Sequence, residues 1–192
     1  PRARGEGQTE DGLPFFAMDL LSGAEPASGA PDAVRAVLAG VADVLRHLHA
    51  RGYVHGDLKP ENVRVEDGGA VRVLDVGLVA PVGERRAAIA GTPAFMAPEV
   101  LRKAPAAPPA DMYALGVLGY VLRAGRPPFA GGPAEMVRGH LAEAPPPIGA
   151  PEADPELDGL LLALLAKEPG ARPSAAAVLA RLAGEPVPEE AP

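Results

Sequence analysis

The chain has 192 residues, 47% of them hydrophobic and 22% charged, a composition typical of a globular protein long enough to bury one core. Its net charge of −7 comes from acids spread along the chain, which leaves no basic stripe for a nucleic acid. The lack of cysteine excludes disulfides and thiolate chemistry, and no apolar run approaches the roughly 20 residues that span a bilayer.

The first elements expected along the chain are a hairpin and a long helix. Residues 13–21 are apolar and aromatic and follow the turn-rich sequence GEGQTEDG, a pattern typical of a hairpin that ends in a buried strand. Between Pro31 and Arg51, apolar residues recur at spacings of three and four. This pattern predicts a helix with one face toward a core, and Gly52 is expected to close it.

Short strands, a long loop and several helices are expected next. Val63–Val65 and Val71–Leu74 are β-type segments separated by the turn EDGG, which predicts a small hairpin. Residues 75–99 show no steady period and indicate a long functional loop. Met112–Ala124 is almost wholly apolar, which predicts a helix buried on all sides. Amphipathic helices are expected at 133–143, 155–167 and 173–183.

Two polar motifs lie on the loops around the predicted small hairpin. Residues 53–62 read YVHGDLKPEN, and Asp75, in the sequence LDVG, follows Asn62 by 13 residues. Four further segments accompany these motifs in order: PFFAMDLL before them, and GTPAFMAPE, DMYALGV and RPS after them. The six segments resemble those of the eukaryotic-type Ser/Thr protein kinases in their residues, order and spacing. In composition they resemble the bacterial members of that family.

The resemblance implies an α+β protein-kinase-like fold, of which the chain would hold mainly the α-helical C-terminal lobe with its small β-hairpin. Residues 1–21 would be a remnant of the N-terminal lobe with the hinge, 22–184 the C-terminal lobe, and 185–192 a Pro/Glu-rich linker or tail. Because the chain starts abruptly at Pro1, we expect it to be a segment of a longer protein. The remnant strand would have lost its sheet partners, so it is expected to expose Phe15, Phe16 and Met18.

The implied reaction is ATP-dependent phosphorylation of Ser or Thr in proteins, with Mg²⁺ as the second cofactor. Asp57 would accept the hydroxyl proton and orient the acceptor, and Lys59 would reach the transferred phosphate. Asn62 and Asp75 would carry oxygen ligands for Mg²⁺, which prefers hard donors. Thr92 would shape the substrate channel beside Asp57 and Lys59, although the local sequence also allows a plain turn residue.

Four further residues of the motifs are expected to support the site. Glu99 and Arg172 would form a buried bidentate ion pair that joins the activation segment to the late helices. Asp111 would brace the catalytic loop as it does in the family, or it would serve as a simple helix N-cap. His55 would pack under the metal motif rather than act as a base. Surface or packing positions are expected for the remaining histidines, His47, His49 and His140.

The resemblance also assigns residues to the nucleotide. Met18 would guard the back of the adenine pocket. The hinge would offer backbone hydrogen bonds at Asp19, Leu20 and Leu21. Arg64 stands at the strand position where the family usually has an apolar residue beneath adenine, and its aliphatic stem or guanidinium plane would cover the base.

The chain departs from the kinase pattern at several positions. Gly56 replaces the Arg that usually pairs with a phosphorylated activation loop, and residues 76–91 contain no Ser, Thr or Tyr, so activity should not depend on phosphorylation there. Val76 replaces the usual Phe and fills less of the pocket that locks Asp75 inward. A Gly-rich phosphate loop is missing, because GEGQTE at Gly5 lacks the third Gly, and no paired Lys and Glu of the small lobe are present. The isolated chain is therefore expected to be inactive or nearly so.

Two other functions stay open on the sequence. A pseudokinase-like scaffold is suggested by Val76, Arg64 and the missing phosphate clamp, and is opposed by the intact set of four catalytic and metal-binding residues. A small-molecule phosphotransferase of the aminoglycoside or choline type shares the HGD motif, but Lys59 and the later segments oppose it. Expected partners are ATP and protein substrates, with no nucleic acid and no membrane segment in this chain. The expected location is the cytoplasm, or the cytoplasmic portion of a longer, membrane-anchored kinase.

Overall fold

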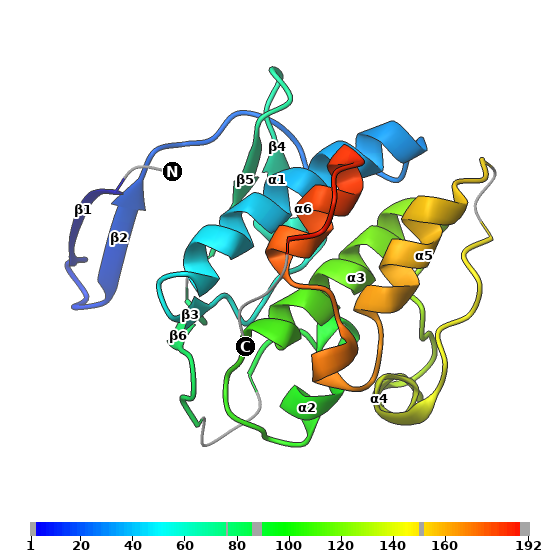
Figure 1. The fold of residues 1–192 in the computed structure, drawn as a ribbon. Helices are drawn as coiled ribbons and strands as arrows, with labels where there is room; N and C mark the ends of the chain where they lie inside the picture. Colours follow the sequence, from blue (N-terminus) through cyan, green and yellow to red (C-terminus); the bar gives the residue numbers. More distant parts are fainter. Residues whose placement is uncertain (1–2, 76, 86–89, 150–151, 189–192) are drawn as a thin grey trace.

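The computed structural model describes residues 3–75, 77–85, 90–149 and 152–188 (Figure 1). In this part of the chain, three two-stranded antiparallel sheets accompany a body of helices. This is the expected α+β arrangement with a mainly helical body. No helix among the described residues is both long enough and apolar enough to cross a bilayer.

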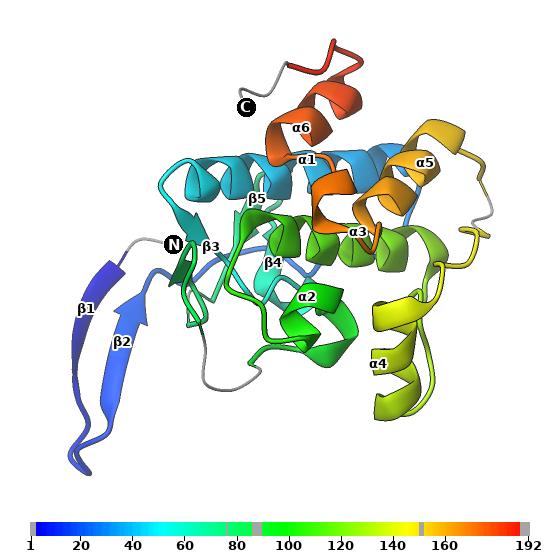
Figure 2. The same ribbon diagram turned by 60° about the horizontal axis from the view of Figure 1, so that its bottom comes forward.

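The N-terminal hairpin consists of β1 (Ala3–Gln8) and β2 (Pro14–Met18) and projects away from the helices (Figures 1 and 2). The expectation of a buried strand over residues 13–21 is wrong, because the strand ends at Met18 and is not buried. Phe15 and Met18 are about half exposed, at 49% and 47%, which confirms the expectation that a strand without its sheet partners exposes them. The physical reason is that β1 is the only strand paired with β2 in the described part of the chain. The side chain of Phe16 lies outside the described residues.

The predicted long helix is present as α1 (Pro31–His49). Proline at the first helical position and Asp32 in the first turn favour its start, and basic residues in the last turn complement the helix dipole. The apolar stripe is buried, as the spacing predicted. Gly52 follows the helix with a φ of 76°, a left-handed conformation that favours glycine.

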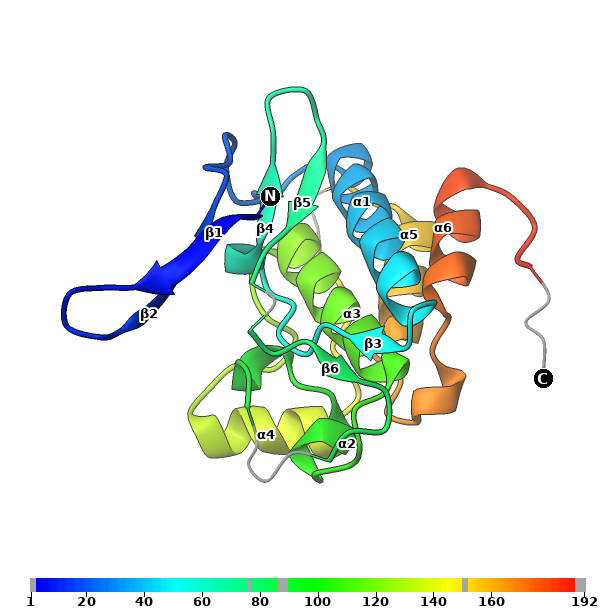
Figure 3. The same ribbon diagram turned by 90° about the vertical axis from the view of Figure 1, so that its left-hand side faces the viewer.

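Two small strand pairs flank the two polar motifs. The predicted hairpin is present as β4 (Val63–Val65) and β5 (Val71–Val73), with Arg64 opposite Arg72. A second pair, β3 (Tyr53–Val54) with β6 (Ala80–Pro81), was not predicted, and it lies at one end of α3 (Figure 3). Residues 75–99 therefore contain short regular elements rather than only loop, including a 3-10 helix at Pro93–Phe95 and the start of α2 (Pro98–Leu101).

The remaining helices are α3 (Pro108–Ala124), α4 (Pro133–Ala142), α5 (Pro155–Leu164) and α6 (Ala175–Ala183). The buried helix α3 starts before the predicted Met112, because Pro108 and Pro109 occupy its first turn, where proline is tolerated. It contacts α1 and α5, while α6 covers the other side of α1 (Figure 2). The close packing needs glycine: a Cβ at Gly119 would lie 2.3 Å from Leu161, and one at Gly116 2.7 Å from Leu164.

Candidate active site

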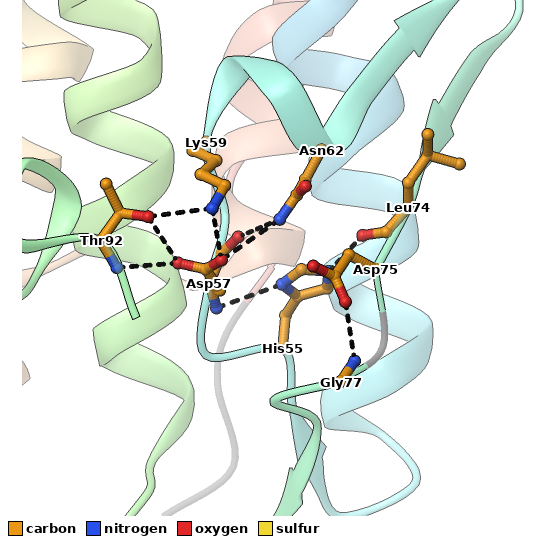
Figure 4. A network of polar contacts seen from close by, with 8 residues as sticks. All are labelled: His55, Asp57, Lys59, Asn62, Leu74, Asp75, Gly77 and Thr92. Carbon is orange, nitrogen blue, oxygen red and sulfur yellow. Dashed lines mark hydrogen bonds and ion pairs between the residues drawn. The ribbon is translucent and has the colours of Figure 1, made fainter. Parts of the chain in front are cut away.

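The polar network around Asp57 lies on the loop between β3 and β4 (Figure 4). The Lys59 ammonium group donates hydrogen bonds to Asp57 Oδ2 at 2.8 Å and to Thr92 Oγ1 at 3.0 Å. Thr92 donates from its backbone N–H and from its hydroxyl group to Asp57 Oδ1, at 2.9 and 3.0 Å. The structure therefore brings Asp57, Lys59 and Thr92 together, although Thr92 comes from a segment 35 residues further on.

The contacts of this network set the charges of its two ionisable groups. Burial disfavours the ionised form of Asp57, but hydrogen bonds from Lys59 and Thr92 outweigh it and hold the pKa of Asp57 below its ordinary value. The hydrogen bond to Asp57 raises the pKa of Lys59, and the charges of Glu61 and Asp75 act in the same direction. At neutral pH the site therefore presents a carboxylate beside an ammonium group.

His55 joins the catalytic loop to the strand end that carries Asp75. Its Nε2 lies 3.1 Å from the carbonyl oxygen of Leu74, and the backbone N–H of Asp57 points to its Nδ1 at 3.3 Å. Because Nδ1 accepts and Nε2 donates, these contacts select the neutral Nε2–H tautomer. The ring is buried, at 3% exposed, and contacts the residue that precedes Asp75.

Asn62 and Asp75 both lie near Asp57 and His55 (Figure 4). The Asn62 amide donates to the carbonyl oxygen of Asp57 at 2.8 Å and to its Oδ2 at 3.4 Å. Asp75 adopts a positive φ of 60°, and its Oδ1 accepts the backbone N–H of Gly77 at 3.0 Å. Figure 4 shows the carboxylates of Asp57 and Asp75 in one site rather than on opposite sides of the molecule.

The oxygen atoms of Asp75 and Asn62 suit Mg²⁺, which takes hard oxygen ligands. Within the described residues, no three acidic or histidine side chains form a complete metal cage. Mg²⁺ is usually bound through one or two carboxylates, with water and substrate phosphates as the other ligands. The oxygen donors of Asp75 and Asn62 therefore fit a magnesium ion bound in that way.

Asp111 holds the backbone of the catalytic loop from the inside of the protein. Its Oδ2 accepts the N–H of His55 at 2.8 Å, and its Oδ1 accepts the N–H of Gly56 at 2.9 Å. The alternative of a simple N-cap is wrong, because α3 begins at Pro108 and its N-cap is Ala107. His49 also contacts Asp111 Oδ2, through Nε2 at 2.8 Å. This role of His49 could not be predicted from the sequence, because nothing near His49 in the chain indicates a partner 62 residues away.

The expected ion pair between Glu99 and Arg172 is present and bidentate. Two guanidinium nitrogens of Arg172 donate to the two carboxylate oxygens of Glu99, at 2.6 and 2.8 Å. The Arg172 side chain is fully buried and its plane lies over the ring of Tyr113 at 4.9 Å. The pair ties α2 to the segment before α6.

Of the residues assigned to the nucleotide, those on the N-terminal hairpin and after it lie apart from the Asp57 network in sequence and in contacts. Met18 ends the projecting strand β2, Asp19 pairs with Arg4 across the hairpin, and Leu20 is 98% exposed, with Leu21 next to it. The following segment returns to the body, because Ala24 exchanges backbone hydrogen bonds with Val65 on β4, at 3.1 and 2.9 Å.

Arg64 lies on β4 next to the returning segment. Its guanidinium group donates to the carbonyl oxygens of Glu61 and Val63 at 3.1 and 3.0 Å, and Glu25 lies 3.5 Å from it. These contacts hold the guanidinium group against the backbone of Glu61 and Val63. Val76, the substitution next to Asp75, lies outside the described residues, as do residues 86–89 of the activation loop.

Comparison with known proteins agrees with this geometry. The protein kinase domain family matches residues 17–182. The DNA damage-responsive serine/threonine-protein kinase RqkA of Deinococcus radiodurans is 38% identical over 191 residues, which cover 91% of this chain and 29% of that protein. The serine/threonine-protein kinase PkaB of Streptomyces coelicolor is 39% identical over 171 residues, or 80% of this chain and 39% of that protein.

A third relative extends the same pattern. The serine/threonine-protein kinase PknL of Mycobacterium tuberculosis is 36% identical over 180 residues, which cover 86% of this chain and 45% of that protein. The chain thus spans less than half the length of each of these relatives. With the Asp57 network and the family match over most of its length, the chain belongs to the protein kinase domain family.

Proposed function

We propose that this chain provides the catalytic lobe of a bacterial-type Ser/Thr protein kinase, which transfers the γ-phosphate of ATP to Ser or Thr of protein substrates. The observation that carries the proposal is the joint contact of Lys59 and Thr92 with the Asp57 carboxylate. The named serine/threonine-protein kinases among the relatives support the same substrate class.

In the proposed reaction, the substrate hydroxyl oxygen forms a bond to the γ-phosphorus while the bond to the bridging oxygen of ADP breaks. Asp57 is ionised and accepts a hydrogen bond from the substrate hydroxyl group. In this way Asp57 orients the hydroxyl group and then receives its proton. Lys59 offers positive charge to the phosphoryl oxygens as they transfer, and Thr92 keeps both side chains in place. Asn62 and Asp75 would hold Mg²⁺, which neutralises phosphate charge when bound.

The division into residues 1–21 as small-lobe remnant and hinge, 22–184 as large lobe, and 185–192 as linker or tail remains part of this proposal. Neither a Gly-rich loop nor a paired Lys and Glu for the α and β phosphates occurs in the 192 residues. Positioning of the phosphates accounts for several kcal/mol of a catalytic barrier, by order of magnitude. We therefore propose that the chain by itself transfers phosphate negligibly. Because the reaction needs ATP, we propose that it takes place in the cytoplasm, either in a cytoplasmic protein or in the cytoplasmic portion of a kinase anchored in a membrane.

The test is an assay of the complete gene product with ATP, Mg²⁺ and a generic Ser/Thr acceptor protein. We expect Asp57→Asn to abolish transfer and Asp111→Asn to reduce it while nucleotide binding persists. A folded product that binds Mg·ADP but transfers no phosphate would favour the scaffold. Transfer to aminoglycosides or choline without transfer to protein would favour the small-molecule enzyme.

A further inference from the structure

A buried histidine, His140, lies in helix α4, and the reaction proposed above does not use it. Its side chain is 0% exposed and meets the rings of Phe129 and Tyr113 edge-on, with ring centroids 5.0 and 5.7 Å away. Helix α4 also contacts α2 and the 3-10 helix at Pro93–Phe95, which directly follows Thr92 (Figure 3). His140 is therefore part of the packing between α4 and the body that carries the active site.

The polar atoms around His140 form a chain of hydrogen bonds. The Tyr113 hydroxyl oxygen lies 2.9 Å from Nδ1 of His140, and the Lys167 ammonium group donates to the same oxygen at 3.4 Å. Burial raises the pKa of Tyr113, so its hydroxyl group keeps its proton. Burial and the charge of Lys167 lower the pKa of His140 to about 4, so the ring is neutral at pH 7. The hydroxyl group therefore donates to Nδ1, which assigns the ring proton to Nε2.

Lys167 also fixes the backbone of α4 at His140. Its ammonium group donates to the carbonyl oxygens of Gly139 and His140, both at 2.9 Å, and these belong to the last four carbonyl groups of the helix. The same nitrogen lies 4.4 Å from the centre of the Phe129 ring, where a cation is attracted to the aromatic face. His140 is thus held both at its backbone and at Nδ1.

The other side of this cluster meets the segment that follows Thr92. Tyr113 belongs to one buried apolar cluster with Ala97, and Phe95 packs against that cluster. Among the described residues, Nε2 of His140 has no hydrogen-bond partner, although the backbone of Ala94 lies close enough to favour a proton there. A buried polar atom without a partner costs free energy, so stability alone does not explain a histidine at this position.

The 3-10 helix in turn borders the reacting groups. The backbone N–H of Phe95 donates to the carbonyl oxygen of Thr92 at 2.9 Å, and Thr92 donates to Asp57. A small cavity next to Asp57 is lined by Thr92, Phe95 and Met96. A protein acceptor whose hydroxyl group reaches Asp57 would therefore have its neighbouring residues beside this segment.

We propose that His140 is a positioning residue for the protein acceptor. Through Tyr113 it holds the 3-10 helix at Pro93–Phe95 in place, and the position of this helix sets how tightly the acceptor binds beside Asp57. The acceptor role rests on the proposed kinase function. The positioning does not, because it follows from contacts within the chain and not from phosphate transfer.

Hydrogen exchange at the Phe95 amide of the 192-residue chain, followed by NMR, tests the positioning. His140→Leu removes both ring nitrogens, whereas His140→Asn keeps an acceptor oxygen at the place of Nδ1. We expect His140→Leu to speed this exchange about tenfold, the change that one lost hydrogen bond gives, and His140→Asn to stay within about threefold of wild type. Tyr113→Phe removes the same hydrogen bond from the other side and replaces His140→Leu if that variant fails to fold.

Two controls separate positioning from a general loss of stability. The Val178 amide, which bonds to the carbonyl oxygen of Ser174 in α6, should exchange as in wild type in every variant. His47→Leu, at an exposed histidine of α1, is the matched variant and should leave the Phe95 amide unchanged. Unchanged exchange at Phe95 in His140→Leu and Tyr113→Phe, or equal acceleration at Val178, would overturn the positioning.

Steady-state kinetics of the complete gene product test the acceptor role. His140→Leu should raise the KM for a Ser/Thr acceptor protein at least about threefold, because only molecules with the segment in place bind the acceptor. The KM for ATP should not change, and His140→Asn should restore the KM for the acceptor. Faster exchange at Phe95 with an unchanged KM for the acceptor would overturn the acceptor role. A wild-type product that transfers no phosphate would refute the proposed function and the acceptor role with it, while the exchange experiment would still decide the positioning.

Discussion

The replacement Arg172→Lys should destabilise the chain strongly although it keeps the charge. All five N–H groups of the guanidinium are used: two donate to Glu99, and the others to the carbonyl oxygens of Pro109, Ala166 and Lys167. A lysine ammonium group has three N–H donors, so at least two acceptors in this buried place lose their partner. Each hydrogen bond from a charged donor contributes about 1.5–3 kcal/mol, which gives a loss of about 3 kcal/mol or more.

Urea unfolding of the purified chain, followed by circular dichroism, measures this loss. For an m value of about 2 kcal/mol/M, a loss of about 3 kcal/mol lowers the unfolding midpoint by about 1.5 M. Arg138→Lys is the matched control, because Arg138 pairs with Glu143 at 2.9 Å on the surface. Its midpoint should equal that of wild type, since exposed ion pairs contribute little. Equal unfolding midpoints for Arg172→Lys and Arg138→Lys would refute the argument that the buried hydrogen bonds of the Arg172 guanidinium group stabilise the fold.

Three further predictions concern packing, pH and regulation. Gly119→Ala should destabilise the chain by about 1–3 kcal/mol in thermal unfolding, because its Cβ would lie 2.3 Å from Leu161. Gly159→Ala, in open space on α5, is the control and should stabilise the chain by up to about 1 kcal/mol. A Gly119→Ala variant more stable than Gly159→Ala would contradict the close approach of α3 and α5. Burial and Lys167 lower the pKa of His140 from 6.5 to about 4, so the unfolded chain binds this proton first as pH falls. About 2 kcal/mol of stability should therefore be lost between pH 7 and pH 5, and His140→Gln should remove most of that loss in urea titrations at the two pH values. Phosphatase treatment of the complete gene product should leave its kinase activity unchanged, because residues 76–91 contain no Ser, Thr or Tyr; a large loss of activity with a phosphosite mapped there would contradict this.

The elements with a repeating apolar pattern could be predicted from the sequence. Helix α1 and the β4–β5 hairpin match their expected positions, because a stripe at helical spacing and a turn between β-branched residues act locally. The β3–β6 pair could not be predicted, since each strand has only two residues and is fixed by a partner far along the chain. The same holds for α2, a helix of four residues.

The candidate site, too, could be predicted from the sequence only in part. The residue types of Asp57, Lys59 and Thr92 marked the site through their resemblance to the kinases, but neither spacing nor periodicity could show that one carboxylate serves both partners. The exposure of Phe15 shows the limit of local patterns, because an apolar strand is buried only where another layer covers it.

The carboxylate of Asp111 has a consequence for how the protein tolerates substitutions. It is 1% exposed, yet its oxygens fix the two residues that precede Asp57, and His49 at the end of α1 contacts the same group. The positions of α1 and α3 and the backbone of the loop before Asp57 are thus coupled through this one side chain. Random substitutions that loosen α1 against α3 should appear in a functional screen as inactive proteins, even though they leave every reacting residue in place.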